Sequence, residues 1–279
     1  MLRYGIPEYR LPRDIIESEF SLIDRLGGEI KFNTEIGKDI LFETLEKEYD
    51  AVLVSIGKQL GRKDRSLNNC DANGVLTAVE FLREISLTRE SKEAKGNVLT
   101  VGGGDVAMDC ARSALRLKNS NDSYVIFLEK NLESLTASKH EVEGAIAEGV
   151  KFIPSSGIKE ILINEEGRVN GVIVKRCESI FNEKGEFSPK FNEENLEKID
   201  VDTLIFAIGQ GVDLTISSGD RFQFNRESLQ NEKNPKVFYA GDCASSNIVV
   251  QAMAEGRRAA KSIIRFLNNE DVWLSLIHI

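Results

Sequence analysis

A run of apolar residues, three glycines and the start of a helical pattern follow one another near the middle of this sequence. Residues 97–101 have the apolar and β-branched character of a buried strand. Read as G-x-G-x-x-A, the stretch places Gly102 at a tight turn, Gly104 where a pyrophosphate approaches bare backbone, and Ala107 where helix and strand pack closely. Residues 106–117 continue as a helix, whose first turn directs free N–H groups and the positive end of the helix dipole at the phosphates.

A second buried strand is predicted after this helix. It covers residues 124–128 and ends at Glu129, an acid that can accept hydrogen bonds from both ribose hydroxyls of an adenosine. A glycine triplet can also be an ordinary strand–helix corner, and an acid after a strand can be a solvated side chain. The order strand, turn, helix, strand and acid favours a dinucleotide site, to which we assign Gly102, Gly103, Gly104, Asp105, Val106, Glu129 and Lys130.

The composition limits what else the chain can do. Its 279 residues are enough for about two domains. The net charge of −9 argues against nucleic acid or an anionic membrane as a main partner, and no apolar run approaches the length of a membrane span. The cysteines lie far apart, so we expect no C-x-x-C redox pair, no iron–sulfur or other metal site within the chain, and a reducing, cytoplasmic setting. These cysteines are Cys70, Cys110, Cys177 and Cys243.

Hydrophobic periodicity divides the chain into alternating helices and strands. Helices are predicted over residues 13–26, 41–47, 78–85, 106–117, 139–148 and 249–267. Strands are predicted over residues 29–32, 49–57, 97–101, 124–128, 150–153, 202–209 and 237–240. The pattern also predicts an antiparallel hairpin at residues 158–163 and 169–175, and a polar loop at residues 178–195.

Residues 2–12 read Leu-Arg-Tyr-Gly-Ile-Pro-Glu-Tyr-Arg-Leu-Pro, and residues 237–242 read Val-Phe-Tyr-Ala-Gly-Asp before a helix. Together with residues 102–117, these stretches resemble the glutamate synthase small-chain group of flavin-dependent pyridine-nucleotide oxidoreductases. The resemblance covers nearly the whole chain. It implies that certain backbone groups lie near the isoalloxazine ring of FAD, and these are Gly5, Ile6 and Pro7. It also implies that Gly241 and Asp242 contact the ribityl–phosphate region of FAD.

The same resemblance implies that two strand ends flank the nucleotides and that the helix after residue 242 belongs to the flavin motif. The residues concerned are Ser55, Gly57, Ala207, Ile208, Gly209 and Val249. The implied fold is α/β, with a Rossmann-like NAD(P) domain inserted in an incomplete FAD domain. We expect FAD-binding segments at residues 1–93 and 213–273, the NAD(P)-binding domain at residues 94–212, and a non-native tail at residues 274–279.

The sequence departs from the resembled group at both ends. That group begins with a G-x-G-x-x-G strand for FAD, preceded in the small chain by iron–sulfur cysteines, and neither occurs before Met1. We therefore expect a fragment truncated at both ends that is inactive by itself. Any iron–sulfur cluster is expected in missing or partner sequence.

The implied function is to pass hydride from NAD(P)H to FAD and electrons on to an iron–sulfur centre or partner subunit, as in the glutamate synthase small chain. Because the cofactors supply the reactivity, no catalytic acid or base is assigned. A non-redox NAD(P)-binding module, a sensor or scaffold, is the alternative. The group usually carries Tyr-Arg-Arg where this chain has Leu128, Glu129 and Lys130. A carboxylate there repels the 2′-phosphate of NADP, so we expect NADH to be preferred.

Overall fold

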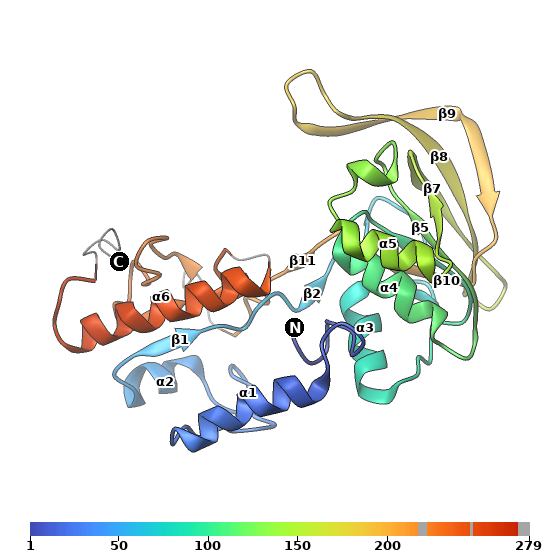
Figure 1. The fold of residues 1–279 in the computed structure, drawn as a ribbon. Helices are drawn as coiled ribbons and strands as arrows, with labels where there is room; N and C mark the ends of the chain where they lie inside the picture. Colours follow the sequence, from blue (N-terminus) through green and yellow to red (C-terminus); the bar gives the residue numbers. More distant parts are fainter. Residues whose placement is uncertain (217–221, 246–247, 273–279) are drawn as a thin grey trace. The chain divides into compact units, whose positions relative to one another are not determined.

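The computed structural model describes residues 1–216, 222–245 and 248–272, so the expected tail at residues 274–279 lies outside the described part. Contacts divide the chain into two compact units (Figure 1). The first consists of Met1–Leu22 and Gly61–Gln210, and the second of Ile23–Leu60 and Gly211–Ile279.

The first unit is built on a parallel sheet with the strand order β3-β10-β4-β5-β6. Its strands are β3 (Val75–Thr77), β4 (Gly96–Val101), β5 (Ser120–Ile126), β6 (Lys151–Ile153) and β10 (Thr203–Phe206). All the residues of β10 are buried, as expected for a parallel strand that is covered on both faces. The glycine turn follows β4, next to the end of β10.

Helices cover one face of this sheet. They are α3 (Ala78–Thr88), α4 (Asp105–Leu115) and α5 (Lys139–Ala147). Phe81 of α3 and Cys110 of α4 pack against Val98 of β4, while Met108 of α4 packs in a second cluster with Val142 of α5. These side chains recur at helical spacing, so the burial of one face follows from the sequence pattern.

An antiparallel sheet covers the opposite face. It is formed by β7 (Ser156–Ile163), β8 (Val169–Phe181) and β9 (Phe187–Ile199). Ile161 and Val172 pack against Leu99 and Ile126 of the parallel sheet. The pairing of β7 with β8 confirms the predicted hairpin.

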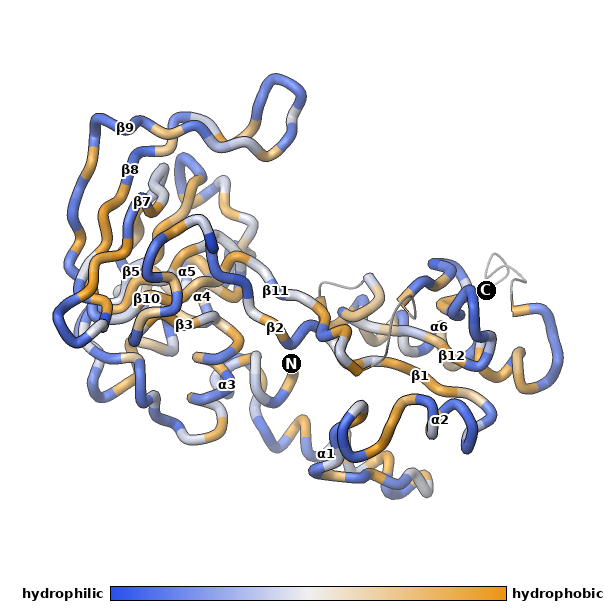
Figure 2. The backbone as a smooth tube through the Cα atoms, turned by 180° about the vertical axis from the view of Figure 1, so that it is seen from behind, coloured by the Kyte–Doolittle hydropathy of each residue, from blue (hydrophilic) through white to orange (hydrophobic). Residues whose placement is uncertain are grey.

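The prediction of a loop at residues 178–195 was wrong, because most of this stretch belongs to β8 and β9. Figure 2 shows mainly hydrophilic residues along β9. This strand is largely exposed, so its side chains carry little apolar signal. The strand forms because its backbone hydrogen-bonds to β8, and this pairing does not depend on apolar side chains.

Residues 61–93 lie with the parallel sheet in the structure. β3 pairs with β10, and α3 packs on the same face of the sheet as α4. The sequence analysis did not predict β3, since a strand this short has no readable alternation. The domain boundary expected at residue 93 remains a prediction. In the structure, the second segment of the first unit begins at Gly61.

The second unit contains a parallel pair, β1 (Val52–Val54) and β12 (Val237–Tyr239), with helices α2 (Phe42–Glu48) and α6 (Val249–Leu267). Its core gathers Phe42, Val54, Val237, Tyr239 and Cys243. The chain leaves or enters this unit within α1 (Arg13–Arg25) and at two paired strands, β2 (Leu60–Gly61) and β11 (Gln210–Gly211).

The prediction of a strand at residues 29–32 was wrong. These residues have no regular secondary structure, and the side chain of Phe32 is 77% exposed. A strand forms only when a neighbour accepts and donates its backbone hydrogen bonds. Among the described residues, none pairs with this segment in a ladder.

Candidate functional site

In the glycine turn, an added Cβ atom would fit at one glycine and clash at another. Gly102 has φ +137°, and a Cβ atom there would lie 2.5 Å from the carbonyl oxygen of Ala207. Gly104 has ordinary extended backbone, and the nearest atom to a Cβ atom there is Oγ1 of Thr136 at 3.6 Å. Glycine is therefore required at residue 102 by the fold. At residue 104 the fold alone would accept a Cβ atom, so the fold does not require glycine there.

Helix α4 begins directly after Gly104, and no side chain caps its N-terminus. The carboxylate of Asp105 points away to another partner, accepting a hydrogen bond from the backbone N–H of Ser138 at 2.6 Å. An uncapped helix start behind a glycine turn is the arrangement that binds phosphate groups through backbone N–H. The glycine turn and the start of α4 therefore fit a pyrophosphate.

Glu129 lies over the same turn. A Cβ atom on Gly103 would be 3.1 and 3.2 Å from its two carboxylate oxygens. Its backbone is held by a hydrogen bond from the N–H of Ser155 to its carbonyl at 2.8 Å. Because β4 and β5 are parallel neighbours, their carboxyl ends meet, which brings the acid after β5 to the turn after β4. Lys130 follows as an exposed side chain.

The end of β10 borders the turn from the other side. The N–H of Ala207 donates to the carbonyl of Val101 at 2.8 Å. Gly209 has φ +113°, and Ile208 is 41% exposed. The structure thus brings the strand end at residues 207–209 beside the glycine turn in the first unit.

The segment before α1 packs within the first unit. The carbonyl of Met1 accepts hydrogen bonds from the N–H groups of Gly5 and Ile6 at 2.7 and 3.1 Å, and Pro7 is buried. Arg13 donates to the carbonyl of Ile6 at 3.1 Å. These contacts hold Gly5–Pro7 as a compact turn.

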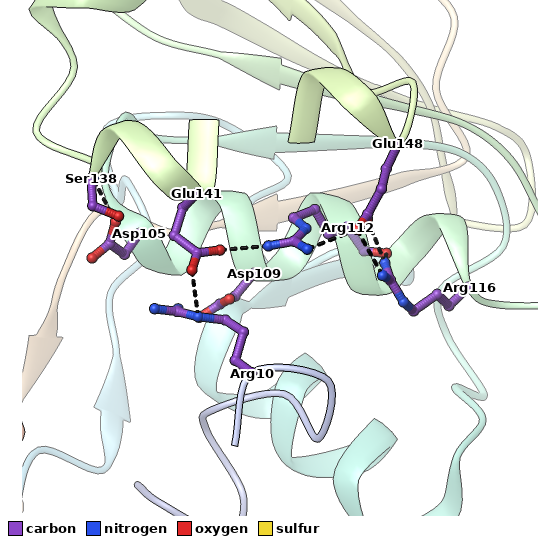
Figure 3. A network of polar contacts seen from close by, with 8 residues as sticks. All are labelled: Arg10, Asp105, Asp109, Arg112, Arg116, Ser138, Glu141 and Glu148. Atoms are coloured by element: carbon purple, nitrogen blue, oxygen red, sulfur yellow. Dashed lines mark hydrogen bonds and ion pairs between the residues drawn. The ribbon is translucent and has the colours of Figure 1, made fainter. Parts of the chain in front are cut away.

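A network of ion pairs joins this segment to α4 and α5 (Figure 3). Arg10 contacts Asp109 at 2.7 Å and Glu141 at 2.8 Å, and both carboxylates are almost fully buried. Arg112 contacts Glu141 at 2.5 Å and Glu148 at 2.7 Å. Arg116 completes the network at 2.6 Å from Glu148, and its hydrogen bond lowers the pKa of Glu148 to about 2.

The sequence did not predict this network. Burial raises the pKa of Asp109 to about 7, although Arg10 beside it acts in the opposite direction. The ring of Tyr9 lies under the guanidinium groups of Arg112 and Arg116, with its centroid 4.6 and 4.0 Å away, and burial raises its pKa to about 12. The only sequence signal was that Tyr9 and Arg10 lie within the motif at residues 2–12.

The other candidate residues lie in the second unit. The N–H of Ala240 donates to the carbonyl of Val54 at 3.1 Å, so the carboxyl ends of β1 and β12 are neighbours. This places Ser55 and Gly57 near Gly241 and Asp242, and both glycines have positive φ, +67° and +77°. Val249 begins α6 and is 39% exposed.

A buried acid also supports this turn, and the sequence did not single it out. Glu255 of α6 accepts hydrogen bonds from the N–H of Gly241 at 2.9 Å and from the hydroxyl of Ser245. Asp242 next to it is not among the buried residues, so its carboxylate can reach a ligand.

The cysteines are all free and buried. Burial raises the pKa of Cys110, Cys177 and Cys243, which disfavours the thiolate. Within the described residues, no cluster of three or more His, Cys, Asp or Glu side chains could hold a metal ion. A search of the same residues found no helix long and apolar enough to cross a membrane.

A parallel sheet whose glycine turn opens into an uncapped helix, with an acid over that turn, defines a dinucleotide-binding α/β protein. The chain belongs to the pyridine nucleotide-disulphide oxidoreductase family, whose model matches residues 5–256. This family binds FAD and NAD(P)H. The fold and the resemblance expected from the sequence are thereby confirmed.

Relatives of the chain are subunits of larger proteins. It is 34% identical to the NADP(+)-dependent formate dehydrogenase subunit beta of Moorella thermoacetica, with 96% of this chain matching 39% of that protein. It is 30% identical to the glutamate synthase (NADPH) small chain of Escherichia coli (strain K12), with 96% of this chain matching 61% of that protein. The chain thus spans less than two thirds of either curated relative.

Solved structures share the fold. Mycobacterium tuberculosis FprA in complex with NADPH superposes with a TM-score of 0.75 over 96% of this chain and 75% of that one. The sequences are 13% identical, so this likeness concerns the fold alone.

Proposed function

We propose that this chain is the part of an electron-transfer flavoprotein that takes hydride from NAD(P)H and passes it to FAD. In this proposal the electrons continue to an iron–sulfur centre or a partner subunit, as in the glutamate synthase small chain. Membership of the family and the subunit relatives support it. The single observation that carries it is the glycine turn, where Gly104 precedes an uncapped helix without being required by the fold and Glu129 lies over Gly103.

The residues of the first unit would hold the nicotinamide nucleotide. The N–H groups at the start of α4 would bind the pyrophosphate, and the carboxylate of Glu129 would accept hydrogen bonds from the ribose hydroxyls. Residues 207–209 would border the nucleotide at the end of β10. We propose that the protein prefers NADH over NADPH, because the carboxylate of Glu129 would repel the 2′-phosphate of NADPH.

Residues of the second unit would hold the flavin. Asp242 would bind the ribityl–phosphate region, with Gly241 held in place by Glu255. Ser55, Gly57 and Val249 would complete this part, and the resemblance also assigns Gly5, Ile6 and Pro7 to the flavin. FAD, when bound, supplies the chemistry that accepts hydride. The chain's task is to bind and orient both cofactors and to exclude water, so no side chain is assigned as a catalytic acid or base.

The proposal of a partner that accepts electrons rests on the positions of the cysteines. Its cysteines are buried and lie far apart in the sequence, so none of them forms a dithiol that could receive electrons from a flavin. An acceptor in another segment or subunit is therefore part of the proposal. The free cysteines also favour a reducing, cytoplasmic setting.

The test uses the complete protein that carries this chain. We expect it to purify yellow and its flavin absorbance to bleach anaerobically on addition of NADH. A colourless protein that still binds NADH would contradict the proposal and favour a non-redox nucleotide-binding module. A yellow protein that neither nucleotide reduces would contradict the electron path.

Asp242→Ala is expected to weaken FAD retention while leaving nicotinamide nucleotide binding nearly unchanged. The substitution removes the partner of a polar group of FAD, at a cost of about 1–3 kcal/mol. The measurement is the FAD content after dialysis. Asp213→Ala is the matched control, since Asp213 lies in the same unit and accepts hydrogen bonds from the N–H and the hydroxyl of Thr215. Full FAD content in Asp242→Ala would contradict the assignment.

A further inference from the structure

Arg10 joins the N-terminal segment to two helices at once. Its Nη1 lies 2.7 Å from Oδ2 of Asp109 on α4, and its Nε lies 2.8 Å from Oε1 of Glu141 on α5. The side chains of the two acids are 5% and 4% exposed. One guanidinium therefore bridges two buried carboxylates that come from different helices.

The two acids depend on this cation. Asp109 faces Arg10, Glu141, Asp105 and the hydroxyl of Tyr9, and of these only Arg10 carries a positive charge. Within the described part of the chain, Oδ1 of Asp109 is buried without a hydrogen-bond partner. Glu141 has a second cation in Arg112, which it shares with Glu148. Without Arg10, no cation would lie between the two acids in this buried place, so Asp109 would either take up a proton or repel Glu141.

The bridge lies one turn from the proposed nucleotide site on both helices. Asp109 is one turn beyond Asp105, where α4 begins, and Glu141 is three residues beyond Ser138, the residue that precedes α5. The N–H of Ser138 donates a hydrogen bond to the carboxylate of Asp105 at 2.6 Å, and the N–H of Ala137 donates one to the carbonyl of Gly103 at 2.9 Å. A change in the spacing of Asp109 and Glu141 therefore reaches the glycine turn through rigid, short connections.

We propose that Arg10 is a positioning residue for the nicotinamide nucleotide: by bridging Asp109 and Glu141 it holds the starts of α4 and α5 in the arrangement that binds the pyrophosphate. The inference rests on the proposed function, since it concerns the same site. It makes nucleotide binding depend on the N-terminal segment, whose Gly5–Pro7 turn is proposed for the flavin side.

The test measures the Kd of NADH in the complete protein with Arg10→Gln, Arg10→Lys and the control Arg3→Gln. Arg3 lies in the same segment but pairs with Glu17 at 3.2 Å on the exposed surface. We expect Arg10→Gln to raise the Kd about tenfold, Arg10→Lys to raise it less because lysine can pair with one carboxylate, and Arg3→Gln to leave it unchanged.

Two further readouts separate positioning from mere stabilisation. Adding Asp109→Asn to Arg10→Gln removes one of the repelling charges and should restore most of the affinity. In Arg10→Gln alone, the Kd should rise as the pH increases above about 7. Burial raises the pKa of Asp109 to about 7, the loss of Arg10 raises it further, and the ionised carboxylate then faces Glu141 without a cation between them. A protein with lowered Tm but unchanged Kd in Arg10→Gln would overturn the inference, as would a double variant that binds no better than the single one.

These outcomes are distinct from failure of the proposed function. If the unaltered protein binds neither NADH nor NADPH, both proposals are wrong. If it binds NADH and Arg10→Gln behaves like Arg3→Gln, only the role of Arg10 falls.

Discussion

Gly104→Ala is expected to raise the Kd for NADH about a hundredfold while lowering the Tm by no more than about 4 °C. Its backbone is extended, at φ −100° and ψ 175°, and an added Cβ atom would come no closer than 3.6 Å to Oγ1 of Thr136. The fold therefore accepts alanine at this position. The methyl group would instead occupy the place where the pyrophosphate meets the backbone.

Two other glycines separate this effect from damage to the fold. Gly102→Ala should cost about 3 kcal/mol of stability, since φ is +137° and the Cβ atom would lie 2.5 Å from the carbonyl oxygen of Ala207. Gly256→Ala meets nothing within 4 Å in helix α6 and should leave both Tm and Kd nearly unchanged or stabilise slightly. The measurements are thermal unfolding and nucleotide titration of each variant. Unchanged affinity in Gly104→Ala would contradict the proposed site.

Glu129→Arg is expected to reverse the cofactor preference, shifting the ratio of kcat/KM for NADPH over that for NADH by about a thousandfold. The carboxylate lies beside Gly103, where it can accept hydrogen bonds from a ribose but would repel a 2′-phosphate. An arginine at the same place reverses both effects, since it pairs with the phosphate. Steady-state kinetics with both nucleotides gives the ratio.

Glu133→Arg is the matched control, because Glu133 is an exposed acid in the short helix η1 (Leu132–Ser134), four residues after Glu129. It makes the same change of charge without the contact to Gly103. An equal shift in both variants would point to a general charge effect. Equal or better turnover with NADPH in the unaltered protein would contradict the preference for NADH.

The candidate nucleotide site could be predicted from sequence because its parts are local. The turn requires glycine at residue 102 for its backbone geometry, and the strand and helix around it have clear periodicity. The acid at residue 129 follows a strand whose partner is the neighbouring β4, so its place follows from the parallel order. The structure brings these residues together as the pattern predicts, and their role in binding remains a proposal.

The errors arose where the local pattern was weak and pairing decided the outcome. Residues 29–32 have a strand-like composition but no strand beside them among the described residues. Residues 187–199 have a polar composition, yet they form a long strand because β8 supplies the ladder. A strand's backbone needs a neighbour, and the neighbour is chosen by the tertiary fold.

By itself, the sequence determined the glycine turn, the helices around it and the hairpin at β7 and β8, because backbone sterics and hydrophobic periodicity act over a few residues. Only the tertiary structure decided that Arg10 would meet Asp109 and Glu141, which lie about a hundred residues or more further along the chain. In the sequence these are three ordinary charged residues. Burial makes them depend on one another, because charges removed from water need a partner, and which charges are buried is settled only when distant segments pack together.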